Sequence, residues 1–115
     1  MKSFTIKNHP RDGEFIVGPT VLGSRTTYLV YNEVAPGQTV PLRAGHGHEE
    51  IFLVVAGSGR LSLGGEEALL AAGQGAYLGE GPDGTVTAAG PEPLRYVCAG
   101  GHVPGGHHHE QAPFS

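Results

Sequence analysis

Residues 51–63 have the sequence IFLVVAGSGRLSL, and this segment is the strongest indicator of the fold class. The apolar run at 51–55 has the length of a strand and the continuous pattern of a strand covered on both faces. Residues 60–63 then alternate polar and apolar side chains, the period of a half-buried strand. Gly64 and Gly65 follow, and two glycines suit a tight hairpin turn because both accept a positive φ. The segment therefore predicts consecutive strands joined by tight turns.

Similar runs recur along the chain between clusters of glycine and proline. Residues 26–34 are rich in β-branched and aromatic side chains, which are typical of strands. Residues 66–72 have high helix propensity, but they directly follow a hairpin signal, so we expect a strand there as well. Short strands at regular spacing predict an all-β sandwich or barrel. Within residues 66–72 the expected strand is 67–70, and the other expected strands are residues 75–78, 85–88 and 94–98.

The composition is that of one small domain. The chain has 115 residues, a length that suits a single domain. Its 20 Gly and 9 Pro disfavour long helices. We expect residues 15–99 to form the barrel, residues 1–14 an N-terminal arm or edge strand, and residues 100–115 an irregular His-rich tail.

The charge of the chain disfavours two classes of partner. With 7 Lys and Arg and a net charge of −4, no basic stripe can neutralise phosphates or anionic lipids, so we expect neither nucleic-acid nor membrane binding.

Three features of the sequence bear on where the protein is located. No apolar run approaches the roughly 20 residues that span a bilayer. Residues 1–15 lack the apolar segment of a secretory signal, and the one cysteine, Cys98, has no partner for an internal disulfide. We therefore expect a cytoplasmic protein.

Three potential metal ligands lie just before and at the start of the apolar run. His46, His48 and Glu50 are separated by single residues, so on an extended strand all three project from one face. Two imidazoles and one carboxylate are a ligand set for iron, zinc, nickel or manganese, with positions left open for water or substrate. A straight strand would separate residues 46 and 50 by about 13 Å, so convergence requires twist or a bulge near Gly47. The alternative is a polar, solvated entry to the strand.

The spacing around Glu50 also matches a known motif. His46 stands four residues before Glu50, and Gly57 stands seven residues after it. In these residues the chain, over 37–97, resembles the cupin superfamily, whose first motif has its second histidine, its glutamate and its glycine at that spacing. The first histidine of the motif falls on Ala44. His48 is an extra histidine, and the resemblance implies that it stands in for the missing ligand.

The second motif of the superfamily aligns without gaps from Gly73. Gly73 and Gly81 match the motif, whereas its proline falls on Gly79, its histidine on Gly84 and its asparagine on Ala88. The usual fourth ligand is therefore absent from its place.

The resemblance implies a jelly-roll cupin barrel, that is, a double-sheet antiparallel β-barrel. It further implies a divalent transition metal (Fe, Zn, Ni or Mn) held by His46, His48 and Glu50, and a small-molecule substrate. Members of the superfamily include dioxygenases and isomerases that act on small oxygenated or aromatic compounds. The substitutions at Ala44 and Gly84 favour an alternative, a non-catalytic cupin that binds a small ligand or a partner protein without metal.

Aromatic and polar residues of the expected strands are candidates for a substrate pocket. Phe52 has the parity of the expected ligands, and Tyr28 and Asn32 follow if the even positions of their strand face inward; Tyr77 is a further candidate. Each of these residues also suits an ordinary core position. Cys98, with no second cysteine and no lysine nearby, is expected to be a small buried residue.

The ends of the chain raise two further expectations. Residues 107–109 are three consecutive histidines, a composition that attracts metal ions; they either supply the missing ligand or belong to an exposed tail. Small barrels leave a sheet edge exposed, and such edges are commonly covered by pairing. We therefore expect a homodimer, with N-terminal strands as candidates for exchange.

Overall fold

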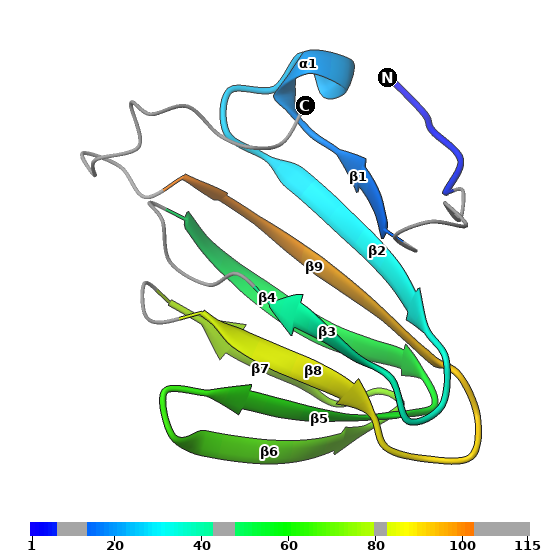
Figure 1. Ribbon diagram of the computed structural model, residues 1–115. Coiled ribbons are helices and arrows are strands. Elements are labelled where there is room, and N and C mark those ends of the chain that lie inside the picture. The colour runs from blue at the N-terminus through cyan, green and yellow to red at the C-terminus, as the bar shows by residue number, and fades with distance from the viewer. Residues whose placement is uncertain (7–13, 43–47, 80–82, 103–115) are drawn as a thin grey trace.

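Two antiparallel sheets face each other across a shared core in the computed structural model (Figure 1). The structure describes residues 1–6, 14–42, 48–79 and 83–102. Within these residues the elements are β1 (Glu14–Val17), α1 (Pro19–Leu22), β2 (Tyr28–Val34), β3 (Thr39–Leu42), β4 (His48–Ala56), β5 (Ser58–Leu63), β6 (Glu66–Ala71), β7 (Gly75–Leu78), β8 (Gly84–Ala88) and β9 (Leu94–His102).

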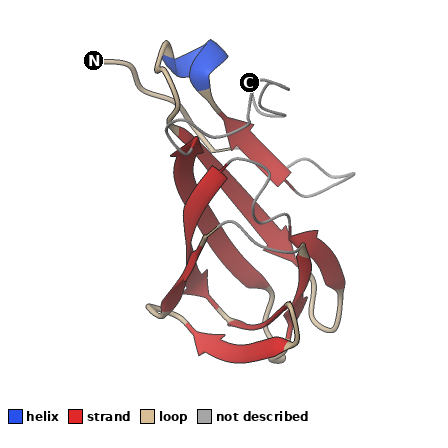
Figure 2. Cartoon of the chain, turned by 90° about the vertical axis from the view of Figure 1, so that its left-hand side faces the viewer, coloured by secondary structure: helices blue, strands red, loops and turns tan. Residues whose placement is uncertain are grey.

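The chain crosses repeatedly between the two sheets. The five-stranded sheet has the order β1-β2-β9-β4-β7, and the four-stranded sheet has the order β3-β8-β5-β6. Strands that are consecutive in sequence, such as β4 and β5, thus lie in different sheets, while β2 pairs with the distant β9. This arrangement is that of a jelly roll, and the expected all-β, double-sheet antiparallel fold is confirmed. Figure 2 shows the two layers from the side.

Alternating burial determines which side chains line the interior. In β2 every second residue is buried and the residues between are half-buried. The buried positions of β2 are Tyr28, Val30, Asn32 and Val34.

The hairpin through Gly64 and Gly65, with φ of 54° and 87°, pairs β6 with β5. This pairing explains why residues 66–71 form the expected strand despite their helix propensity.

The apolar run in β4 departs from the expectation of a strand covered on both faces. Phe52 and Val54 are fully buried, whereas Ile51, Leu53 and Val55 are 59%, 37% and 52% exposed. The four-stranded sheet lies against only one face of the five-stranded sheet (Figure 1). β4 therefore alternates like any one-sided strand, and its run is continuous only because the outward residues are apolar too.

Three elements, β1, β3 and α1, lie outside the predicted set. β3 contains Pro41, which has no N–H to donate, and β3 is an edge strand of the four-stranded sheet, where that loss is tolerated. α1 starts at Pro19, whose fixed φ suits the first turn of a helix, and is capped by Gly23 with a φ of 73°. No helix in the described part of the chain is long and apolar enough to cross a membrane.

The core lies between the sheets. Phe52, Leu94 and Tyr96 of the five-stranded sheet pack in one cluster with Leu61 and Val86 of the four-stranded sheet. Burying a large apolar side chain contributes about 1.5–3 kcal/mol, so this cluster holds the layers together and fixes the inward rows of β2, β4 and β9. The site described next occupies these same rows.

Candidate functional site

Two polar side chains are buried among the described residues of the interior. Glu50 is 7% exposed and Asn32 is 3% exposed. Glu50 shares the inward row of β4 with Phe52 and Val54, as expected from its parity. A carboxylate among apolar side chains costs free energy unless hydrogen bonds or a cation compensate it, so the neighbours of Glu50 determine what the site can do.

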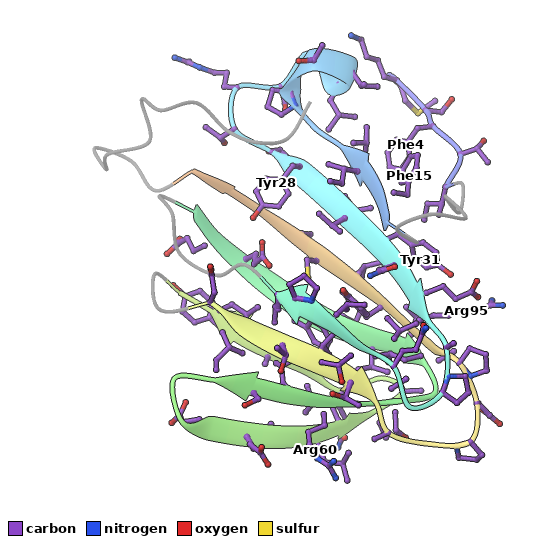
Figure 3. All side chains as sticks on the ribbon, in the orientation of Figure 1. Phe4, Phe15, Tyr28, Tyr31, Arg60 and Arg95 are labelled. Carbon is purple, nitrogen blue, oxygen red and sulfur yellow. The ribbon has the colours of Figure 1, made fainter. Side chains whose placement is uncertain are left out.

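The register of the sheet brings Tyr28 to Glu50. Tyr28 pairs with Gly100 across β2 and β9, and Gly100 pairs with Glu50 across β9 and β4. Figure 3 shows Tyr28 projecting from β2, and its hydroxyl donates a hydrogen bond to Oε2 of Glu50. A Cβ on Gly100 would lie 2.2 Å from the Glu49 carbonyl oxygen and 2.7 Å from the Glu50 Cβ. Because Gly100 has no side chain, β9 fits between Tyr28 and Glu50 and the hydrogen bond between them can form.

Cys98 is a second partner of Glu50. Its side chain is 2% exposed and forms a hydrogen bond with the Glu50 carboxyl group. Its Cα pairs with that of Phe52, one inward step along β4 from Glu50. The expectation of a small buried residue is confirmed, and the contact with Glu50 adds a polar role to it.

Burial and hydrogen bonding act in opposite directions on Glu50. Burial raises the pKa of its carboxyl group, while the hydrogen bonds from Tyr28 and Cys98 lower it, and the pKa remains above its ordinary value. The pKa of Tyr28 is raised as well, first by burial and then by its hydrogen bond to Glu50 and the negative charge there. Tyr28 therefore keeps its proton at neutral pH and acts as a donor.

A second polar contact lies further along the same rows. Nδ2 of Asn32 donates to the Tyr96 hydroxyl at 3.2 Å, and Oδ1 of Asn32 accepts from the Glu33 backbone N–H at 2.8 Å. The ring of Phe52 stacks on Tyr96 with centroids 4.7 Å apart. Tyr28, Asn32 and Phe52, three of the expected pocket residues, thus all face the interior.

Tyr77 does not join them. Its side chain is 67% exposed, and its hydroxyl donates to Oε2 of Glu49 at 2.7 Å. Tyr77 pairs with Ile51, and both belong to the outward rows of their strands. The pocket expected from its aromatic character therefore does not include Tyr77, because its parity in β7 is that of the outer face.

The histidines of the expected metal site are only partly covered by the structure. β4 begins at His48, and the Cα of His48 pairs with that of His102 at the end of β9. His46, residues 107–109 and the side chain of His48 lie outside the described residues. Of the three expected ligands, Glu50 is thus the one whose side-chain contacts are described.

The donor set can be compared with what a metal ion requires. Glu50 and Cys98 lie together, but no group of three His, Cys, Asp or Glu side chains in the described ranges could hold a metal ion. A catalytic site for a transition metal usually has three protein ligands. Gly84 cannot be exchanged for a fourth ligand, since a Cβ there would lie 2.0 Å from the Ser62 carbonyl oxygen. The described side chains therefore supply one carboxylate ligand, and His46 and His48 are the donors that would complete a set.

Sequence reasoning missed the contacts around Glu50. The inward parity of Glu50 was visible in the pattern, and Tyr28 was a pocket candidate on its own strand. Their pairing depends on the register of β2, β9 and β4, which no local pattern encodes. The one signal available was the Gly100-Gly101 dipeptide in a strand-like segment, since glycine in a strand marks a close approach of neighbouring groups.

Comparisons with known proteins agree with the observed fold. The family model described as Cupin domain matches residues 30–100. A cupin protein of Bacteroides fragilis is 19% identical, with a TM-score of 0.69 over 93% of this chain and 91% of that one. No curated protein sequence matches this chain.

Two further solved structures are similar. An uncharacterized conserved protein of Klebsiella pneumoniae with a double-stranded β-helix domain is 21% identical, with a TM-score of 0.63 over 72% of this chain and 73% of that one. A predicted oxalate decarboxylase of Thermotoga maritima is 16% identical, with a TM-score of 0.67 over 78% and 81% of the two chains. At these identities the likeness concerns the fold.

Proposed function

This chain belongs to the cupin family, and on that basis we propose that it binds a small molecule inside the barrel, beside a divalent metal ion held by His46, His48 and Glu50. The observation that carries the proposal is the buried carboxylate of Glu50 in an interior that is otherwise largely apolar. A group that is costly to bury and has a perturbed pKa is a candidate for a functional site.

The surroundings of Glu50 suit a metal ligand. Ligating carboxylates are themselves held by hydrogen bonds that fix their orientation, and Tyr28 and Cys98 provide such bonds. His48 precedes Glu50 by two residues on the same strand, so strand alternation gives both the same parity. A cation between an imidazole and Glu50 would compensate the cost of burying the carboxylate.

Each interior residue has a distinct role in this proposal. A bound metal ion polarises an oxygen atom of the ligand or activates a water molecule. Tyr28 keeps its proton on the hydroxyl oxygen and orients Oε2 of Glu50. The contact between Asn32 and Tyr96 offers polar atoms deeper in the barrel, and Phe52 provides an apolar wall that excludes water.

We propose the class of reaction by analogy with other members of the family. Cupins with such a metal set include dioxygenases and isomerases of small oxygenated or aromatic compounds, and we extend that class to this chain. The predicted oxalate decarboxylase among the similar structures makes small carboxylic acids the first compounds to test. Their oxygen atoms are suitable donors for a metal ion with open positions.

A second candidate function is supported by a separate observation. Ala44 and Gly84 stand where the family has two of its ligands, and Glu50 is already bonded by Tyr28 and Cys98. A non-catalytic cupin that binds a small ligand or a partner protein without metal would have these properties.

Elemental analysis distinguishes the two candidates. The untagged full chain is purified without chelator, beside His46→Ala/His48→Ala and a control, His107→Ala/His108→Ala, which removes two tail histidines. A metal site predicts about one equivalent of metal in the wild type and the control, and less than about a tenth of an equivalent in the first variant. A metal-free wild type contradicts the proposal and favours the second candidate, and metal lost only in the control assigns binding to the tail.

A further inference from the structure

Four inward positions of the five-stranded sheet form a row at the end of the barrel that holds Glu50. Leu78 of β7 pairs with Glu50 of β4. On the other side of Glu50 the row continues through Gly100 of β9 to Tyr28 of β2. Leu78 is buried, so Glu50 has an apolar neighbour on one side, while the Tyr28 hydroxyl reaches it from the other.

Three inward positions of the four-stranded sheet lie at the same end of the barrel. β5 runs back after β4 and ends at Leu63, so Leu63 lies at the end where β4 begins (Figure 1). Leu63 pairs with Gly84, and Gly84 pairs with Leu42. Leu42 is buried, and Leu63 is half-buried against the core. We call the two sets the end rows: Tyr28, Gly100, Glu50 and Leu78 in one sheet, and Leu42, Gly84 and Leu63 in the other.

Solvent reaches the end rows more than it reaches the rest of the interior. Glu50 and Leu78 are each 7% exposed, and Leu42 is 5% exposed. Four residues further along β4, Val54 is 0% exposed, and so is Val86, two residues along β8 from Gly84. A small molecule that enters the described part of the barrel therefore meets the end rows before the closed core behind them.

The two end rows differ in chemistry. Glu50 and Tyr28 provide oxygen atoms in one sheet, where the proposed metal ion binds. The three positions in the other sheet are two leucines and one glycine, so none of these described side chains carries a charge or forms a hydrogen bond. A Cβ on Gly84 would lie 2.0 Å from the Ser62 carbonyl oxygen, which keeps a polar side chain from this position. One end of a bound ligand thus meets oxygen atoms, and the rest meets hydrocarbon.

We propose, resting on the metal-bound function above, that the end rows select a monocarboxylic acid with an apolar body, a branched chain or an aromatic ring, over a small dicarboxylic acid. The carboxylate of the ligand takes an open position on the metal ion beside Glu50, and its hydrocarbon part packs on Leu42, Leu63 and Leu78. Each methylene group buried there tightens binding by about fourfold. A second carboxylate would lose its hydration against the leucines without gaining a hydrogen-bonded or charged partner.

Isothermal titration of the Zn²⁺-loaded full chain with acids of equal length tests this preference. Free Zn²⁺ is removed first, so that the acids meet only bound metal. Butyrate and succinate both have four carbon atoms, and succinate has a second carboxylate where butyrate has a methyl group. Butyrate is expected to bind at least about tenfold more tightly than succinate. 3-Methylbutyrate, with one methyl group more, is expected to bind about fourfold more tightly than butyrate.

Leu63→Asn and Leu70→Asn are a matched pair of variants for the same titrations. Both leucines are half-buried against the core of the four-stranded sheet, but Leu70 pairs with Gly59 at the other end of β5. Leu63→Asn adds a hydrogen-bond donor to the end rows, so the preference for butyrate over succinate is expected to fall at least about threefold. Leu70→Asn is expected to keep the wild-type preference.

The quantity compared is the ratio of the two dissociation constants. A variant that is partly unfolded loses affinity for both acids alike, so the ratio is unaffected, and circular dichroism measures the folded fraction. The wild-type series decides the question alone if a variant does not fold.

Three results would overturn the inference and leave the proposed metal site in place. The first is a Zn²⁺-loaded wild type that binds succinate as tightly as butyrate, or more tightly. The second is a Zn²⁺-loaded wild type that binds none of the acids. The third is an unchanged preference in a folded Leu63→Asn variant. A wild type without metal in the elemental analysis contradicts the proposed function itself, and this inference with it.

Discussion

Glu50 is held in the interior by two donors from two different strands. Tyr28 reaches it from β2 and Cys98 from β9. A phenol and a thiol each donate a hydrogen bond without carrying a charge. The carboxylate is thereby fixed in one orientation, which a ligand to a metal ion or to a bound acid requires.

Tyr28→Phe removes one of these donors without changing the size of the ring. A hydrogen bond to a charged or partly charged group contributes about 1.5–3 kcal/mol, so we expect the free energy of unfolding to fall by about that amount. Urea denaturation measures it. Tyr31→Phe, at a half-buried outward position of the same strand, is the control and should change stability by less than about 0.5 kcal/mol. Equal effects of the two variants would show that the bond to Glu50 contributes nothing specific.

The raised pKa of Glu50 gives the metal-free chain a pH dependence of defined sign. In the unfolded chain Glu50 loses its proton near its ordinary pKa of 4.5, while in the folded chain it keeps the proton to a higher pH. The stability that this group contributes is therefore complete below about pH 4.5 and is lost as pH rises through the folded pKa.

Glu50→Gln removes this titration. Relative to the variant, the chelator-treated wild type should lose stability as pH rises above 4.5; unfolding by urea at a series of pH values measures the difference. Glu49→Gln, at an exposed position of the same strand, should keep the wild-type profile. A wild type that gains stability relative to Glu50→Gln over this window would contradict the raised pKa.

At the scale of strands, Gly100 of β9 pairs with Tyr28 of β2 on one side and with Glu50 of β4 on the other, and its lack of a side chain allows this close pairing. Gly100→Ala places a Cβ 2.2 Å from a backbone oxygen, so the strands must separate, and overpacking of this kind costs about 1–3 kcal/mol. Gly90→Ala is the matched control, because its Cβ would meet nothing closer than 3.7 Å. Thermal unfolding compares the two. A Gly100→Ala variant as stable as Gly90→Ala would show that the close pairing at this row is unnecessary.

The strands were predictable to different degrees, for physical reasons. Alternation identified β5, and turn signals at Gly64 and Gly65 were strong enough to outweigh the helix propensity of β6. β3 was missed because Pro41 is tolerated only where a strand lies at a sheet edge, which is a property of the assembled sheet. The outward exposure of Ile51 could not be predicted from the sequence, because Ile51 is apolar like its buried neighbours.

The candidate site was predictable in outline only. Strand parity alone predicts that Glu50 faces the interior, and it predicts the same for Tyr28 and Asn32 once their strand is recognised. The bond between Tyr28 and Glu50 joins residues 22 positions apart through a third strand, and such a contact follows from register and not from spacing. Tyr77 was assigned to the pocket by residue type, but its position in β7 places it on the outer face.

At the scale of the whole molecule, the two faces of the five-stranded sheet differ in character. The inner face carries Glu50 and its donors, and the outer face carries exposed apolar side chains, among them Ile51 and Val55. If metal binds at Glu50, it should also stabilise the folded chain. A ligand at about 100 times its dissociation constant adds about 2.7 kcal/mol, so chelation should lower the melting temperature of the wild type. A chelator that leaves the melting temperature of metal-loaded protein unchanged would contradict this coupling.

The most direct test of a metal ion held by Glu50 is a titration of the chelator-treated full chain with Zn²⁺, comparing Glu50→Gln with Glu49→Gln. The two variants make the same change at adjacent positions, one buried in the barrel and one exposed on its outer face. We predict that Glu49→Gln binds one equivalent with wild-type affinity and that Glu50→Gln, which loses a direct ligand, binds more weakly by at least the factor of about 10–100 that loss of an outer-shell partner causes. Equal affinity in the two variants would contradict a metal site built on Glu50.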